Sequence, residues 1–520
     1  MRSEASPCSY SLKMFSRQAL TKYNGLTIVM SNPSRFDKDS LLTGQIESLY
    51  EKILNRNGSS LLGADLLLTG ESNIGDELRD DTKCLLIHGQ KALSVFKPGV
   101  SVKEQRGSPF ESKILRPSGE VLRISSIATF DPQDSIDPQN WEARKNPLLN
   151  GEDTDGEGST EDLKSTHGAT RRDHYQFWFQ KDLAKVCRYV KHGWHPHVGT
   201  KILVQPSSKT ILEALTKNKG KYFYLDIETD AMLNLTCWGF SFLPKDTYDL
   251  DNLCPKLVIV VPFYDYNGRH SYSKMATVQI LRALSIALRD NTVVCHNCLF
   301  DLFVLAWKYR IAPGKLVEDT MLMTHRCYPE MEKSLGHTIS LWTDQEYHKN
   351  EGVFEPKNFQ AQSDLRLYNA KDVESMMLVH QKIRAYARKD KGLRDSFQQA
   401  NESIRPYLLL NLTGYRMDIE WLKEKIAMND RLMMQYLRIC EMLCGYEINP
   451  GSSDQVGSYL ISVGVKLAIA EPTNERNLYK YMLKQDLPLL RVVIKYRGVK
   501  KETSALKFRR YYGIGVINEH

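Results

Sequence analysis

One stretch, residues 222–230, constrains the fold of this chain more than any other. Its sequence, YFYLDIETD, is dense in aromatic and branched side chains, which are typical of β-strands. Because successive side chains of a strand point to opposite faces, Asp226 and Glu228 share one face. Two neighbouring carboxylates repel each other and resist dehydration, whereas divalent cations favour such oxygen ligands. Taken alone, the pair fits a solvated strand end better than a metal site.

The segments around this stretch predict an α/β domain over residues 218–392. Short runs of branched and aromatic residues alternate with longer runs that have helical spacing. One of the strand-like runs alternates poorly, as a strand buried on both faces does. The expected elements are strands at 222–228, 236–242 and 256–263, a helix at 275–288, a strand at 292–296, a helix from 297 to 309, and a helix from 364 to 385.

Three acidic motifs follow one another within this domain. They are Asp226-Ile-Glu228, Asn297-x-x-Phe-Asp301 and Tyr368-x-x-x-Asp372. The two members of the third motif are four residues apart, so they share one face of a helix. In order and spacing, the motifs resemble those of 3′–5′ exonucleases of the DEDD type, tyrosine subclass. The resemblance implies a ribonuclease H-like fold, with a mixed sheet flanked by helices.

The resemblance also implies roles for these residues. Four carboxylates would hold two divalent metal ions, Mg²⁺ or Mn²⁺: Asp226, Glu228, Asp301 and Asp372. Tyr368 would orient the attacking water and complete the catalytic set, because its ordinary pKa near 10 makes it a poor base. Thr229 and Asn297 would contact DNA. Structural alternatives stay open at this point, a core aromatic for Tyr368 and a turn residue for Asn297.

Residues 1–150 predict a smaller α/β domain. Its strand-like runs lie at Leu26–Met30, 84–87 and 121–128. Small-residue loops and helical stretches separate the runs, which favours a parallel sheet. Resemblance to the uracil-DNA glycosylase superfamily is carried by Gly89, Arg106, Gly107 and residues 129–132. That family usually has histidine where Asp131 stands, so we expect a domain without glycosylase activity, either structural or in contact with DNA.

Two segments connect these domains. Residues 151–172 are rich in glycine, serine and acidic side chains and lack the apolar residues of a core, which predicts an exposed, flexible linker. Residues 173–217 form a connecting segment, in which helical spacing from His174 to Val190 predicts a helix that packs against a neighbouring domain.

Residues 393–520 predict a helical segment, with helices at 395–412 and 419–443. The phrase LTGYRMD at 412–418 resembles the segment that joins exonuclease to polymerase in family A DNA polymerases, and NPGSSDQV at 449–456 resembles their thumb, where a polar loop precedes a helix. The segment ends on a basic helix that includes Arg497, Lys500 and Lys501. Such a helix is often a solvated face, but beside a nuclease it favours contact with duplex phosphates. No palm or fingers motif is found in the sequence.

Composition sets broader bounds. The chain has 520 residues, 42% of them hydrophobic and 25% charged, which is typical of globular domains. A net charge of +8 permits a polyanionic partner, and ten scattered cysteines favour reduced thiols over disulfides. The sequence has no apolar run long enough to span a bilayer and no secretory signal, so we expect a cytoplasmic protein without a membrane partner.

Together these resemblances describe the N-terminal part of a phage-type family A polymerase whose gene is split. The expected function is proofreading 3′–5′ exonuclease in DNA replication, with single-stranded DNA at the nuclease site and duplex at the thumb. A separate polypeptide would supply palm and fingers, in an infected bacterial host. Two alternatives remain: a free-standing DEDD nuclease that trims RNA or damaged DNA, and a non-catalytic DNA-binding subunit.

Overall fold

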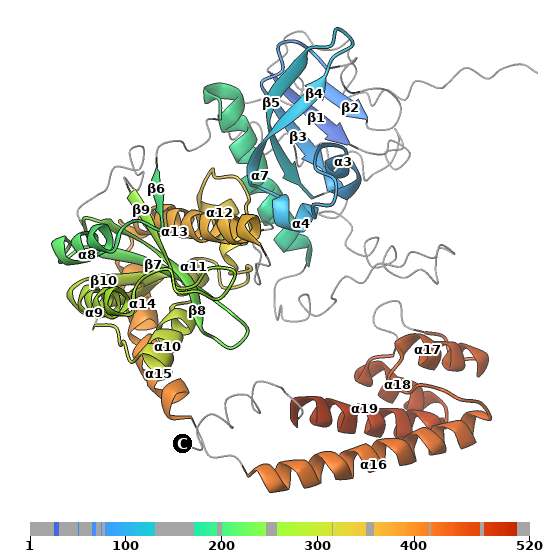
Figure 1. Cartoon of the computed structure of the whole chain (residues 1–520). Coiled ribbons are helices and arrows are strands. Elements are labelled where there is room, and N and C mark those ends of the chain that lie inside the picture. Colours follow the sequence, from blue (N-terminus) through green and yellow to red (C-terminus); the bar gives the residue numbers. More distant parts are fainter. Residues whose placement is uncertain are drawn as a thin grey trace, which may run out of the picture. The chain divides into compact units, whose positions relative to one another are not determined.

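The computed structural model describes residues 25–30, 50, 65–68, 74, 78–130, 171–194, 200–245, 257–314, 316–349, 358–414, 418–467 and 473–506. By their internal contacts, residues form two compact units, Met1–Leu412 and Thr413–His520 (Figure 1). The predicted linker at 151–172 lies outside the described residues except for its last two. Among the described residues, no helix is long and apolar enough to cross a membrane.

The first unit begins with a five-stranded sheet in the order β2-β1-β3-β5-β4. Its strands are β1 (Leu26–Met30), β2 (Asp65–Leu68), β3 (Cys84–His88), β4 (Pro109–Leu115) and β5 (Val121–Thr129). All neighbouring pairs are parallel except β4 and β5, which are antiparallel. The three strands predicted here are confirmed, and so is the parallel arrangement. Strand β4 was not predicted, and it adds an antiparallel edge because a short turn after Leu115 returns the chain directly.

Among the residues described here, the helices that accompany this sheet are α3 (Gly89–Phe96), α4 (Val102–Gln105) and α7 (Arg171–His192). Helix α7 confirms the helix predicted from His174 to Val190, although it begins three residues earlier. One face of α7, with Phe179, Leu183 and Val186, shares a buried core with Leu26, Ile28 and other residues of the sheet. The helix predicted to pack against a neighbouring domain therefore covers the N-terminal sheet.

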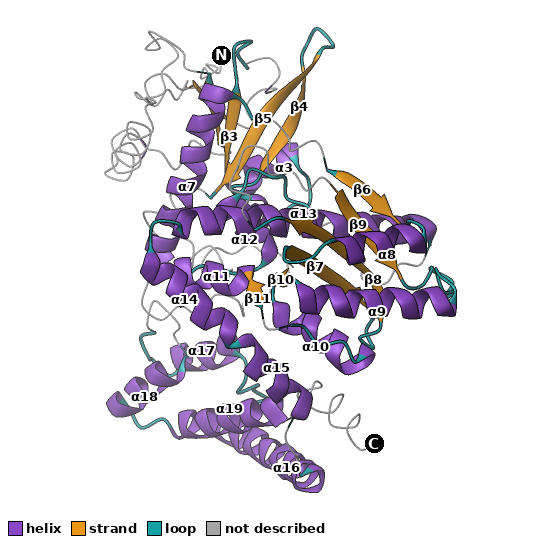
Figure 2. Ribbon diagram, turned by 90° about the vertical axis from the view of Figure 1, so that its left-hand side faces the viewer, coloured by secondary structure: helices purple, strands orange, loops and turns teal. Residues whose placement is uncertain are grey.

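A second sheet of the same unit has six strands in the order β11-β10-β7-β8-β9-β6 (Figure 2). These strands are β6 (Lys201–Val204), β7 (Tyr222–Thr229), β8 (Leu235–Leu243), β9 (Leu257–Pro262), β10 (Thr292–Cys295) and β11 (Val317–Asp319). Strand β8 is antiparallel to both neighbours, and the other pairs are parallel. This mixed sheet flanked by helices is consistent with the predicted ribonuclease H-like domain. All four strands predicted in this region are present.

Helices cover this mixed sheet. They are α8 (Ser208–Lys217), α9 (Lys274–Asp290), α10 (Cys298–Tyr309), α11 (Thr320–Cys327), α12 (Leu335–Trp342) and α13 (Phe359–Ala387). Helix α13 lies on the face to which Tyr224 points, because the Tyr224 hydroxyl is 2.8 Å from both His380 Nδ1 and Gln381 Nε2. This is the face that also carries Asp226 and Glu228. The helix predicted to begin near Asp364 starts at Phe359, capped by the Asn358 side chain.

One helix prediction needs a correction. The helix expected over 395–412 is divided into α14 (Lys391–Glu402) and α15 (Ile404–Thr413). Ser403 interrupts it, and the Ser403 hydroxyl donates to the Ala400 carbonyl at 2.6 Å. Pro406 accounts for the break, because proline has no amide hydrogen to bond the carbonyl one turn earlier.

The second unit is helical, and its described helices are α16 (Ile419–Cys444), α17 (Ser453–Ser462), α18 (Glu475–Lys484) and α19 (Pro488–Leu506). Helices α16 and α19 lie against each other along much of their length (Figure 1). A buried core including Cys440, Leu460, Leu478 and Leu490 joins the four helices. The helix predicted over 419–443 is confirmed, ending at Gly445 in the left-handed region.

Candidate active site

Strand β7 brings the two carboxylates of the first motif to the edge of a hydrophobic core. Phe223, Leu225 and Ile227 are buried on one face of the strand, and Asp226 and Glu228 alternate with them toward α13. Carboxylate oxygens of Asp226, Glu228 and Asp372 all lie within 4.8 Å of one another. The first and third predicted motifs therefore converge, although 144 positions of sequence separate Glu228 from Asp372.

Asp301 joins this group from α10. One oxygen of its buried side chain accepts a hydrogen bond from the backbone amide of Ile227 at 3.2 Å, between the two acids of β7. The first residues of α10 orient this helix toward β7. Asn297 is left-handed, with φ of 69°, and the Asp319 carboxylate accepts from the amides of Asn297 at 3.1 Å and Cys298 at 2.8 Å.

Most of these carboxyl groups are poorly compensated. Burial, and then the charge of Asp372, raise the pKa of Glu228 to about 7. Burial and the neighbouring acids also raise the pKa of Asp226 well above its ordinary value. The pKa of Asp301 is raised well above its ordinary value by burial, although the Ile227 amide opposes this shift. Such shifts mark a cluster of negative charge that lacks a counter-charge.

Asp372 is the exception, because a histidine and a lysine side chain reach it. Its oxygens lie 2.8 Å from His348 Nε2 and 2.6 Å from the Lys349 ammonium. Although burial raises the pKa of Asp372, these two partners lower it below its ordinary value. The Lys349 ammonium also lies 4.2 Å from the centre of the Tyr368 ring. Burial raises the pKa of Tyr368, so its hydroxyl keeps its proton at neutral pH.

Sequence reasoning missed three residues of this site. His348 and Lys349 come from the segment after α12, and nothing in their spacing connects them to Asp372. Asn369 donates to the Asp226 carboxylate at 2.7 Å and to its backbone carbonyl at 3.2 Å. Gly239 on β8 leaves room for that amide, because a Cβ at this position would lie 2.4 Å from Asn369 Oδ1. Asn369 stands three residues before Asp372, and this helical spacing could have identified it.

The oxygen ligands of this site fit a hard divalent cation. Three carboxylates converge, and magnesium and manganese favour ligands of this kind. The raised pKa values of Asp226 and Glu228 support the same conclusion, because burial and then mutual repulsion raise them, and a bound cation would stabilise the charged carboxylates. The described structure therefore offers one well-formed set of ligands, with Asp301 beside it.

The residues predicted to contact DNA occupy different environments. Thr229 is partly buried at the end of β7, next to a bulge, and Asn297 is exposed at the start of α10. In the second unit, Lys500 and Lys501 are exposed on α19. Arg497 instead donates to the carbonyl of Pro450 at 2.8 Å and to that of Thr473, which gives it a role within the helical unit.

Residues 247–387 match a family model described as 3'-5' exonuclease, of the DNA polymerase A type. The matched residues include Asp301, Tyr368 and Asp372, and strand pairing places Asp226 and Glu228 beside them in the same domain. The chain thus contains a 3′–5′ exonuclease domain of the family A DNA polymerase type, a family that uses divalent metals and binds DNA.

Two solved structures are similar to parts of the chain. The first is described as the POL domain of Pol1 from M. smegmatis in complex with DNA primer-template and dNTP, with 12% identity and a TM-score of 0.40. That match covers 59% of this chain and 49% of the other, so the chain spans about half the length of that structure. The second, an apo form of a nuclease, has 15% identity, a TM-score of 0.32, and coverage of 43% and 98%. Comparison with curated proteins found no match.

Proposed function

We propose that this chain is the proofreading 3′–5′ exonuclease part of a family A DNA polymerase, and that it hydrolyses the 3′-terminal phosphodiester of DNA with two divalent metal ions. The observation that carries the proposal is the convergence of Asp226, Glu228 and Asp372 within one exonuclease domain. When bound, the ions would activate a water and neutralise the leaving oxygen.

Each side chain has a role in this proposal. Asp226, Glu228 and Asp372 would hold the first ion, and Asp226 would also face the second with support from Asp301. The Ile227 amide fixes the Asp301 carboxylate, and the Asn369 amide fixes that of Asp226. Tyr368 keeps its proton, so its hydroxyl can donate a hydrogen bond that orients the attacking water. Thr229 and Asn297 would contact the DNA end.

We further propose that the helical unit serves as a polymerase thumb, within the predicted segment 393–520. Lys500 and Lys501 are exposed and would contact duplex phosphates, whereas Arg497 would organise the loops before α17 and α18. A thumb has a use only beside a palm and fingers, which a separate, phage-encoded polypeptide would supply. Affinity purification of a tagged chain with a candidate palm polypeptide tests this, and failure of the two to associate would count against it.

The N-terminal sheet, within predicted domain 1–150, is proposed to be glycosylase-like in fold and structural in function. His88, at the end of β3, is buried between Tyr50 and Phe179, and its Nδ1 lies 2.9 Å from the Phe130 carbonyl. Arg106, of the predicted motif, is buried with its guanidinium 3.3 Å from the Trp178 ring centre. Both His88 and Arg106 are therefore packed among protein groups, which supports a structural role for these two residues.

A 5′-labelled single-stranded oligonucleotide tests the exonuclease directly. The wild-type chain with Mg²⁺ or Mn²⁺ should shorten DNA from its 3′ end in single-nucleotide steps, and chelation should stop this. Asp226→Asn should reduce the rate by roughly a thousandfold or more, because it removes a charged ligand. Preferential digestion of RNA would favour the free-standing nuclease, and a metal-independent or absent activity would contradict the proposal.

A further inference from the structure

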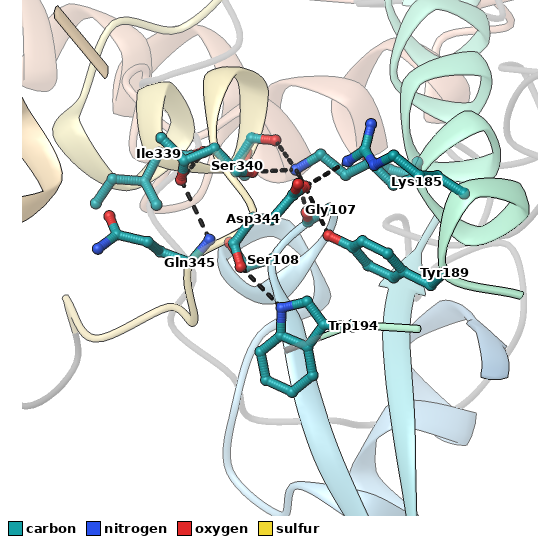
Figure 3. A network of polar contacts seen from close by, with 12 residues as sticks. Gly107, Ser108, Lys185, Tyr189, Trp194, Ile339, Ser340, Asp344 and Gln345 are labelled. Atoms are coloured by element: carbon teal, nitrogen blue, oxygen red, sulfur yellow. Dashed lines mark hydrogen bonds and ion pairs between the residues drawn. The ribbon is translucent and has the colours of Figure 1, made fainter. Parts of the chain in front are cut away.

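A second cluster of buried polar residues joins the N-terminal sheet to the exonuclease domain (Figure 3). Its centre is a stripe along α7 formed by Trp178, Asp182, Lys185 and Tyr189, all buried. These residues recur at helical spacing beside the face packed against the sheet, and Tyr189 also belongs to the core that α7 shares with the sheet. The stripe meets Arg106 and Gly107 on one side and the end of α12 on the other.

Lys185 caps the carboxyl end of α12. Its ammonium donates to the carbonyls of Ser340 at 2.6 Å, Thr343 at 2.7 Å and Gly107 at 2.8 Å (Figure 3). The last carbonyls of a helix have no partner within the helix and carry a partial negative charge, so a cation stabilises them. An ammonium has three hydrogens to donate, and here all three are directed to backbone carbonyls. Lys185 thereby connects the end of α12 to Gly107, which lies just before β4 of the N-terminal sheet.

Arg106 and Asp182 complete this junction. The Arg106 guanidinium lies on Trp178, pairs with Asp182 at 3.4 Å and donates to the Ser340 hydroxyl. Asp182 also accepts from the Thr129 hydroxyl at 2.8 Å. Position 107 requires glycine for two reasons. Its φ of 69° lies in the left-handed region, and a Cβ there would lie 2.4 Å from Asp182 Oδ1.

Side chains from α7 and Trp194 also hold the segment that follows α12. This segment leads to the active site. Asp344 accepts from the Tyr189 hydroxyl and Arg188, both at 2.6 Å, and its carbonyl accepts from the Trp194 indole at 2.9 Å. The following residues fold back along α12, since a Cβ on Gly336, in its first turn, would lie 2.8 Å from the Tyr347 ring and 3.3 Å from the Lys349 stem.

Five residues after Thr343, this segment reaches the active site, where His348 and Lys349 contact the two oxygens of Asp372. We infer that Lys185 is a positioning residue for the exonuclease: by capping α12 from α7, it fixes residues 343–349 and so places His348 and Lys349 at Asp372. The N-terminal sheet thus has a use in proofreading without contacting DNA. This inference rests on the proposed function for its effect on turnover, but not for its effect on the segment.

Lys185→Met tests it, with Lys181→Met as the matched control. Lys181 lies one turn earlier on α7, and its ammonium is near the Phe177 and Tyr328 rings instead of the α12 carbonyls. In metal-free protein, amide exchange over residues 344–349 should accelerate by about tenfold in Lys185→Met and stay at the wild-type rate in the control. With Mn²⁺ and DNA, kcat should fall by about tenfold at constant KM, because the outer partners of a metal ligand are lost.

Tyr189→Phe provides a second variant in case Lys185→Met does not fold. It keeps the buried ring and removes only the bond to Asp344, so the same changes should appear at about threefold. Wild-type exchange over residues 344–349 in either folded variant would overturn the inference. Faster exchange in a chain whose wild-type form digests no DNA would support the positioning and would contradict the proposed function alone.

Discussion

The two sheets of the first unit each carry a cluster of buried charge, but the clusters are built in opposite ways. Around α7, Arg106 faces Asp182, and Lys185 faces three carbonyls and, at 3.9 Å, Asp344. At the end of β7, four carboxylates gather, and among the described residues only Asp372 has a lysine partner, Lys349, with His348 at its other oxygen. The first cluster combines charges of opposite sign, whereas the second consists mainly of carboxylates that repel one another.

This difference separates structure from function in a single chain. Burying a charge costs several kcal/mol unless an opposite charge and hydrogen bonds compensate for it. The α7 cluster pairs opposite charges and adds hydrogen bonds, so it can hold two parts of the chain together, although burial still raises the pKa of Asp182 and lowers that of Lys185 to about 8. The β7 cluster has too little positive charge beside its carboxylates, and the raised pKa values of Asp226, Glu228 and Asp301 are the result. Uncompensated negative charge of this kind favours a site that binds cations.

The largest effect on stability is expected at the balanced cluster. Asp182→Ala leaves Arg106, which is 1% exposed, without its carboxylate, and it removes the partner of Thr129. Breaking a buried ion pair on one side costs about 3–5 kcal/mol, so the free energy of unfolding should fall by that amount in a urea titration. Asp81→Ala is the control, because its pair with Arg79 is exposed and should contribute less than about 1 kcal/mol. Equal effects of the two variants would contradict the comparison.

The second-largest effect on stability is expected when the pH falls, and it should differ between the two sheets. Burial lowers the pKa of His88 to about 4, whereas the unfolded chain has a value near 6.5. Between these values only the unfolded chain takes up the proton, so His88 costs stability as pH falls, by roughly 3 kcal/mol at pH 4. His296 in the exonuclease has a similarly lowered pKa, but Glu228, raised to about 7, has the opposite sign and offsets it.

Amide exchange of metal-free protein from pH 7 to pH 4, corrected for intrinsic rates, measures this difference. Strand β3 should lose protection before β10 does, and His88→Gln should remove the difference because glutamine does not titrate. If β10 opens first in the wild-type chain, the carboxylates of the active site do not provide the expected compensation.

What the sequence could predict of this site follows from local periodicity. The alternation of β7 puts Asp226 and Glu228 on one face, and the spacing of Tyr368 and Asp372 puts both on one face of α13. His348 and Lys349 could not be found in this way, because they reach Asp372 only through the path of residues 343–349 over Gly336. The role of Arg106 was hidden for the same reason, since its partners Asp182 and Ser340 are 76 and 234 positions away. Long-range packing decides such contacts, and a single sequence has no period that reports it.

A substitution of Lys349 tests how far the chain's own side chains compensate for the negative charge at the end of β7. The Lys349 ammonium lies 2.6 Å from a carboxylate oxygen of Asp372 and would compete with a metal ion for that side chain, so Lys349→Met should bind Mn²⁺ about tenfold more tightly, or about 1.4 kcal/mol. Calorimetric titration of metal-free protein measures this, with Lys349→Arg as the control that keeps the charge. Weaker binding in Lys349→Met would show that the lysine supports the metal ligands more than it competes for them.

The smallest effect distinguishes the clusters most directly. In metal-free protein at pH 8, Asp226→Asn should leave stability unchanged or raise it by up to about 1 kcal/mol, because it removes one of several carboxyl groups that burial and mutual repulsion disfavour. Its amide oxygen can still accept from Asn369, so the packing is kept. Thermal unfolding in the presence of chelator measures the change, and saturating Mn²⁺ should stabilise the wild-type chain more than the variant. A loss of several kcal/mol on the metal-free side would mean that the folded protein depends on the Asp226 charge as it does on the ion pair of Asp182 with Arg106, and the distinction between the two clusters would fail.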